Sequence, residues 1–207
     1  MEENAIINKQ DEDNKFSIRY KPVDIKNSHR PYEGGWCGLG FEVFLSGVNL
    51  KEYYGSEPLN RQLVGHLWHP YSLISIGEGI LNGYETYNKF GDGSHIDLHF
   101  EPEGNYTLVS LCNSVYNPCV VAFDPSIVRP ARVTREHAAF QFFNAYNDLF
   151  GDVVKYDSKK TICKLIEDQT YIRSNPKYRN LFESRGRRLH EIPEEFRHLL
   201  PPEHVLN

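Results

Sequence analysis

Three polar side chains alternate along one short apolar stretch of the chain. His95, Asp97 and His99 stand two residues apart, so on a β-strand all three project from the same face. Two imidazoles and one carboxylate at this spacing are suitable ligands for a first-row transition metal, as a metal-dependent hydrolase would require. The same alternation is the ordinary pattern of a strand with one solvent-facing side. Because spacing along one strand selects weakly for metal binding, we expect no stoichiometric metal and no other cofactor.

Two further pairs of residues carry ligand-type side chains. His66 and His69 precede a proline at an expected helix end, where histidines commonly bond to the last carbonyl groups. Cys112 and Cys119 flank a short loop, and they could pair, bind a metal with the histidines, or pack as free thiols. We expect all four cysteines to be reduced, as in the cytoplasm. The sequence holds no Gly-x-Ser-x-Gly elbow, Walker loop or dinucleotide fingerprint, so no motif indicates catalysis.

Tyrosines and arginines indicate binding instead. Tyr84 and Tyr87 are expected in loops or at element ends, and tyrosine is amphipathic and common at protein interfaces. Arg185, Arg187 and Arg188 form a basic patch near the C-terminus, which fits an acidic partner surface or simply a solvated face. The net charge of −5 disfavours general nucleic-acid binding, which usually shows a basic face. We therefore expect a protein partner.

Length and composition restrict the class of protein. The 207 residues suit one large domain, or one domain with an appendage, and the 40% of hydrophobic residues can form a sizeable core. No run approaches the roughly 20 apolar residues that a membrane helix needs. The acidic, polar N-terminus lacks the basic start and apolar stretch of a signal peptide. These features predict a cytoplasmic protein that does not bind membranes.

The stretch Ser94–Cys112 reads as a β-hairpin around which the other elements are organised. Its first half alternates apolar and polar residues, Glu101–Gly104 suits a turn, and Tyr106–Cys112 returns as a second strand. The most secure helix is Arg135–Phe150, with Thr134 as its N-cap and Gly151 as its stop. Apolar periodicity predicts further strands at Phe16–Tyr20, Trp36–Leu45 and Pro118–Phe123, and further helices at Pro58–Trp68, Tyr71–Tyr84, Ser158–Tyr171 and Glu194–Leu200.

These elements predict an α+β fold, with an antiparallel sheet and the amphipathic helix packed on one of its faces. We divide the chain into a disordered tail (1–15), an α+β domain (16–152) and a helical or irregular C-terminal extension (153–207). From Trp36 to Asp157, the order of strand, helical middle, hairpin IDLHFEPEGNYTLVSL, strand VVAF and helix REHAAFQFFNAYNDLF resembles small bacterial immunity proteins of polymorphic toxin and contact-dependent inhibition systems. The resemblance implies a non-enzymatic protein that binds and neutralises a cognate toxin.

Overall fold

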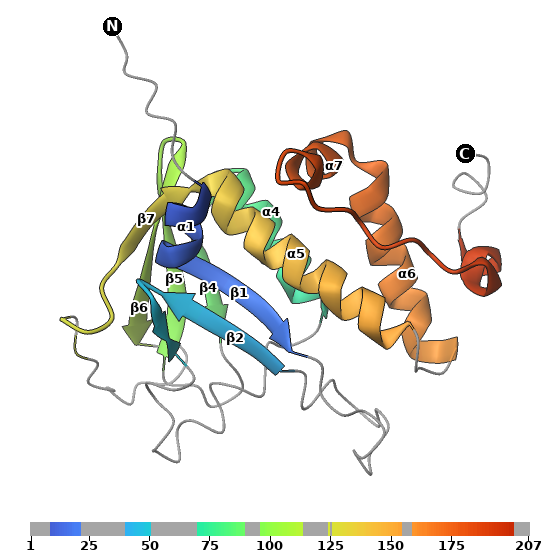
Figure 1. Ribbon diagram of the computed structural model, residues 1–207, viewed down its shortest axis with the longest axis horizontal. Coiled ribbons are helices and arrows are strands. Elements are labelled where there is room, and N and C mark those ends of the chain that lie inside the picture. Colours follow the sequence, from blue (N-terminus) through green and yellow to red (C-terminus); the bar gives the residue numbers. More distant parts are fainter. Residues whose placement is uncertain are drawn as a thin grey trace, which may run out of the picture.

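Two antiparallel sheets contribute to one core in the computed structural model of the protein (Figure 1). The structure describes residues 9–21, 40–50, 70–89, 96–113, 124, 126–154 and 159–200. The α+β class predicted from the sequence is confirmed, with two sheets where one was expected. Sheet A has the order β1 (Phe16–Lys21), β2 (Gly40–Leu45), β3 (Val48–Asn49), and sheet B the order β4 (Thr86–Lys89), β5 (Ile96–Glu103), β6 (Tyr106–Asn113), β7 (Ala131–Thr134).

Five α-helices and one 3-10 helix lie within the described residues. The long helix α5 runs between the strands on one side and the C-terminal helices α6 and α7 on the other (Figure 1). None of the described helices is long and apolar enough to cross a bilayer. The helices are α1 (Lys9–Lys15), α4 (Pro70–Leu81), α5 (Arg135–Val153), α6 (Lys159–Ser174), α7 (Pro176–Glu183) and the 3-10 helix η1 (Glu194–Leu199).

Helix α5 is buried on two sides because its apolar face is wide. Towards the sheets, the ring of Phe142 packs against Phe16 of β1 and Phe100 of β5, with centroids 6.2 and 5.5 Å away. Away from them, Phe143 packs against Tyr178 of α7 at 4.7 Å. Gly77 of α4 lets that helix approach closely, since a Cβ there would lie 2.9 Å from the Phe143 ring. Phe143 is therefore fully buried where α5 meets α4 and α7.

The predicted hairpin is confirmed, with a correction to its turn. Strand β5 continues through Pro102, which pairs with Thr107, and the chain reverses at Gly104 and Asn105. Gly104 has a φ of +63°, a conformation that glycine adopts without the steric cost of a Cβ. The turn predicted over Glu101–Gly104 therefore begins two residues too early, because Pro102 is tolerated inside the strand.

Two further predictions are corrected at the ends of helices. Lys9–Lys15 forms α1, so the acidic tail predicted to be disordered is structured in that part. Helix α5 continues past Gly151 to Val153, because this glycine makes room for the imidazole of His190 and does not end the helix. The helices predicted around α4 and α6 are confirmed within a few residues, whereas α7 was not predicted. The elements predicted at Pro58–Trp68 and Pro118–Phe123, with the first residues of Trp36–Leu45, lie outside the described residues.

Candidate functional site

The histidine face of the hairpin is not the open polar surface that its alternation indicates. Asp97 of β5 is completely buried, at 0% exposure. His99 is mostly buried, and its Nε2 lies 2.8 Å from Oε1 of Glu85. His95 lies outside the described residues. Within the described part of the chain, no three histidine, cysteine, aspartate or glutamate side chains converge as a metal site would require.

The thiol of Cys112 lies beside Asp97 across strands β5 and β6. Its Sγ is 3.7 Å from the backbone carbonyl oxygen of Asp97. Burial, followed by the nearby Asp97 carboxylate, raises the pKa of Cys112. Cys112 is therefore held as a thiol, which is a poor nucleophile. Cys112 and Cys163 are free cysteines, while His66, His69, Cys37 and Cys119 fall outside the described residues.

A compact cluster of Tyr87, His99 and Glu85 stands at the edge of sheet B. Tyr87 and His99 are directly opposite each other on β4 and β5, and their rings stack at 4.5 Å with an angle of 10° between the planes. Oε1 of Glu85 accepts a hydrogen bond from the Tyr87 hydroxyl at 2.8 Å and contacts His99 at the same distance. The hydrogen bond from Tyr87, and then the one from His99, lowers the pKa of Glu85. The same bond to Glu85 raises the pKa of the Tyr87 hydroxyl.

This cluster extends into an exposed surface that carries both predicted tyrosines. Tyr84 is 68% exposed and Tyr87 is 41% exposed. Glu101 follows His99 by two residues on β5 and therefore projects from the same face. Glu103, further along the strand, is neutralised by Arg132 at 2.7 Å. We call the surface made by Tyr84, Glu85, Tyr87, His99 and Glu101 the tyrosine patch.

The three arginines predicted to form one binding patch have different surroundings. Arg185 turns inward, with its guanidinium over the ring of Phe140 at 4.7 Å. Arg187 forms an ion pair with Asp148, whose two carboxylate oxygens accept from its Nη2 at 2.9 and 3.1 Å. Arg188 is exposed. Arg185 is therefore part of the network around His137 and lines a groove together with Arg187, whereas Arg187 and Arg188 line a second pocket.

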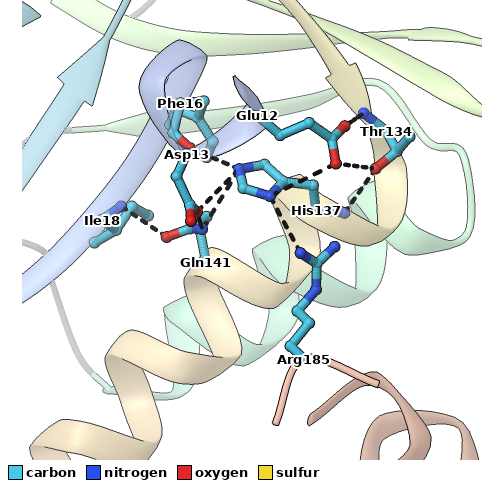
Figure 2. Close-up of polar contacts among 8 residues, drawn as sticks. All are labelled: Glu12, Asp13, Phe16, Ile18, Thr134, His137, Gln141 and Arg185. Carbon is cyan, nitrogen blue, oxygen red and sulfur yellow. Dashed lines mark hydrogen bonds and ion pairs between the residues drawn. The ribbon is translucent and has the colours of Figure 1, made fainter. Parts of the chain in front are cut away.

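His137 is the centre of a buried polar network that the sequence did not reveal (Figure 2). Its Nε2 lies 2.7 Å from the carbonyl oxygen of Phe16, and a carbonyl only accepts, so Nε2 carries the proton. Nδ1 is then free to accept from Nη1 of Arg185, 3.4 Å away. Burial is the main cause that lowers the pKa of His137, which favours the neutral ring. The network therefore holds a neutral imidazole with both nitrogens engaged.

Glu12 of α1 and Gln141, which is on α5 like His137, complete this network. The Glu12 carboxylate accepts hydrogen bonds from the backbone N–H and the hydroxyl of Thr134, at 2.6 and 3.2 Å. The Gln141 side chain accepts from the backbone N–H of Ile18 at 3.1 Å and donates to Asp13 at 2.9 Å. Figure 2 shows these side chains converging from α1, β1 and α5. The one local signal was the spacing of His137 and Gln141, four residues apart on one helix face.

The network stabilises the fold and does not have the access that a catalytic base needs. A groove of about 430 Å³ runs beside it, lined by Asp13, Gln141, Arg185 and Arg187 among others. His137 itself has 0% exposure, however, and a general base must come within hydrogen-bond reach of its substrate. The tyrosine patch, in contrast, combines ordered side chains with real exposure, and it is the candidate binding site. Comparison of the chain with protein-family models, with curated proteins and with solved structures finds no match.

Proposed function

We propose that this protein is a protein-binding module, an immunity-type inhibitor that binds and neutralises a cognate bacterial toxin through the tyrosine patch. The observation that carries the proposal is that Tyr87 is both ordered and exposed. Its ring is stacked on His99 and its hydroxyl bonds to Glu85, yet 41% of the residue is accessible. A side chain already fixed in one position loses little conformational entropy when a partner covers it. Tyrosine is also among the residues that contribute most to binding energy at interfaces.

Charge specifies the chemistry of the partner. Glu85 and Glu101 are exposed carboxylates near Tyr87, whereas Glu103 is already paired with Arg132. The patch is therefore acidic, and a basic surface on the toxin complements it. Attraction between opposite charges speeds the encounter of two proteins and weakens as salt screens it. Association should therefore slow as the salt concentration rises.

Two described side chains that could act in catalysis, His137 and Cys112, are unsuited to it, which favours a binding function over an enzymatic one. His137 has the chemistry of a base, but it is inaccessible. Cys112 has the chemistry of a nucleophile, but burial and Asp97 favour its thiol form. Neither side chain lies in the tyrosine patch, where the histidine, His99, is stacked on Tyr87 and hydrogen-bonded to Glu85. The side chains of that surface are therefore suited to binding a partner.

The test is co-purification with the product of the adjacent reading frame, followed by a growth-rescue assay in cells that express that product. Tyr87→Ala should weaken the complex by roughly 2 kcal/mol or more, about thirtyfold in Kd, and should reduce rescue. Tyr171→Ala is the matched control, because Tyr171 is 47% exposed, donates to a glutamate and contacts one other ring. The control should bind as the wild type does. Failure to recover a partner, together with metal-dependent hydrolysis of an ester or phosphoester, would overturn the proposal.

A further inference from the structure

A second, separate site lies at the C-terminal end of the described chain. A pocket of about 360 Å³ opens between the end of α6, helix α7 and the extended segment that follows α7. In Figure 1 this segment passes from α7 across α6 towards η1. The pocket is lined by Arg173, Arg179, Phe182, Glu183, Arg187, Arg188, Leu189 and Glu191, and we call it the arginine pocket.

Two of its four arginines are held in place by the protein. Arg173 donates from Nη1 to the carbonyl oxygen of His190 at 3.0 Å, and its Nη2 lies 2.8 Å from the exposed Glu191 carboxylate. Arg187 donates from Nε to Asn144 at 3.0 Å in addition to its ion pair with Asp148. Their guanidinium groups are therefore held in fixed orientations.

The other two arginines, Arg179 and Arg188, provide positive charge that ion pairs do not neutralise within the described residues. Arg179 of α7 and Arg188 of the following segment are exposed, and no carboxylate among the described residues lies within ion-pair distance of either. Four arginines and two glutamates line the pocket, so positive charge exceeds negative charge there although the whole chain is acidic. An excess of like charge on converging side chains attracts an anion and repels cations.

The shape and walls of the pocket indicate which anion. Guanidinium groups match the oxygens of phosphate with paired hydrogen bonds. Leu189 is partly exposed and adds apolar wall to the same pocket, with Phe182 buried behind it at 1% exposure. The volume of the pocket is at the lower end of the roughly 300–1,000 Å³ of small-molecule sites. We propose that the arginine pocket binds a small organic phosphate ester, with its phosphate group on Arg179 and Arg188 and its carbon part against Leu189.

The test is calorimetric titration of the full-length protein at low salt with phenyl phosphate, inorganic phosphate and benzoate. Phenyl phosphate should bind at one saturable site, more tightly than inorganic phosphate, which lacks the apolar contact, and more tightly than benzoate, which offers fewer oxygens and less charge. The double substitution Arg179→Gln/Arg188→Gln should weaken phenyl phosphate binding at least about tenfold, because each arginine provides charge-assisted hydrogen bonds.

Arg129→Gln/Arg132→Gln is the matched control, since it changes the net charge equally with two exposed arginines that do not line the pocket. It should leave the affinity within about twofold of the wild type. Tyr87→Ala should also leave it unchanged, which separates this site from the tyrosine patch. The proposal is overturned by the absence of saturable binding, by equal losses in the two double variants, or by benzoate binding as tightly as phenyl phosphate.

Discussion

Glu12 caps the first turn of helix α5 through Thr134, although the two residues are 122 positions apart in the chain. Thr134 is itself the N-cap, and its hydroxyl accepts the backbone N–H of His137 at 3.2 Å. The Glu12 carboxylate therefore places negative charge at the N-terminal end of the α5 dipole, where negative charge is stabilising. The acidic helix α1 is a structural support of the core helix.

Replacing Glu12 should destabilise the protein measurably. Glu12→Ala leaves the partly buried N–H of Thr134 without its acceptor, and we expect a loss of about 1–3 kcal/mol in the free energy of unfolding. Urea denaturation at neutral pH measures it. Asp11→Ala is the control, because Asp11 is a carboxylate on the same helix with an exposed side chain. Equal effects of the two substitutions would contradict the capping role of Glu12.

The protein should lose stability as the pH falls through the histidine range. Burial lowers the pKa of His137, so below the ordinary histidine pKa of about 6.5 the unfolded chain takes up a proton that the folded protein excludes. The free energy of unfolding should therefore fall between about pH 7 and the lowered pKa, by at most about 1.4 kcal/mol per pH unit for this one group.

Comparison with His137→Gln isolates this contribution. Glutamine keeps an N–H that can donate to the carbonyl oxygen of Phe16 but does not titrate. Urea denaturation of both proteins at about pH 7.5 and about pH 5.5, on either side of the ordinary histidine pKa, should show a smaller decrease for the variant, even if its absolute stability is lower. Identical decreases would assign the pH dependence to other groups.

Phe143 should be among the most sensitive positions of the core. It is fully buried between α4, α5 and α7, and Phe143→Ala should cost about 3–5 kcal/mol. Glu136→Ala, on the exposed side of the same helix, should cost no more than about 1 kcal/mol, which is the contribution of a negative charge in the first turn. A loss below about 1 kcal/mol for Phe143→Ala would mean that the helix faces another way.

The close approach of Gly77 to Phe143 allows a second, independent test of the packing of Phe143. Gly77→Ala should crowd the Phe143 ring, which lies 2.9 Å from the position of the added Cβ. This crowding lowers the free energy of unfolding, whereas the higher helix propensity of alanine raises it. In the Phe143→Ala background that crowding is relieved. Gly77→Ala should therefore be more favourable in the double variant than in the wild type, by roughly 0.5–3 kcal/mol. Additive effects would contradict direct contact.

The sequence predicted those elements whose signal is local. The alternation of Leu98 and Phe100 and the wide apolar face of α5 follow from periodicities of two and 3.6 residues, and both were read correctly. The end of α5 was predicted wrongly at Gly151. A glycine is needed there because the imidazole of His190, 39 positions away, lies against it, and no neighbouring residue reveals that contact. Sequence patterns report the period of an element more faithfully than its tertiary contacts.

The difference between local patterns and tertiary contacts also explains which features of the candidate sites could be predicted from the sequence. Tyr84 and Tyr87 were expected in loops or at element ends, and both are exposed, although Tyr87 lies within strand β4; their role in binding stays a prediction. The burial of Asp97 and the network of Glu12, His137 and Arg185 depend on packing between distant segments. No spacing rule joins residues that are 48 or more positions apart, so only the structure shows that Arg185 points inward.

Glu78 of α4 should control how firmly the C-terminal helices are attached. One oxygen of its carboxylate accepts hydrogen bonds from the hydroxyls of Tyr171 of α6 and Tyr178 of α7. The bond to Glu78 is the main cause that raises the pKa of Tyr171, and burial, followed by the bond to Glu78, raises the pKa of Tyr178. Glu78→Gln replaces the charged acceptor with a neutral one and should cost about 1–3 kcal/mol. Amide hydrogen exchange should accelerate in α6 and α7 more than in β5 and β6.

The control for Glu78→Gln is Glu183→Gln, which removes an exposed carboxylate from α7 itself and leaves both tyrosine hydrogen bonds to Glu78 intact. It should leave exchange in α6 and α7 unchanged, because exposed charges contribute little to stability. Tyr178→Phe should reproduce most of the effect of Glu78→Gln, since its hydroxyl is the more buried of the two donors. Uniform acceleration of exchange across the whole protein would show that Glu78 stabilises the fold globally and does not anchor the C-terminal helices specifically.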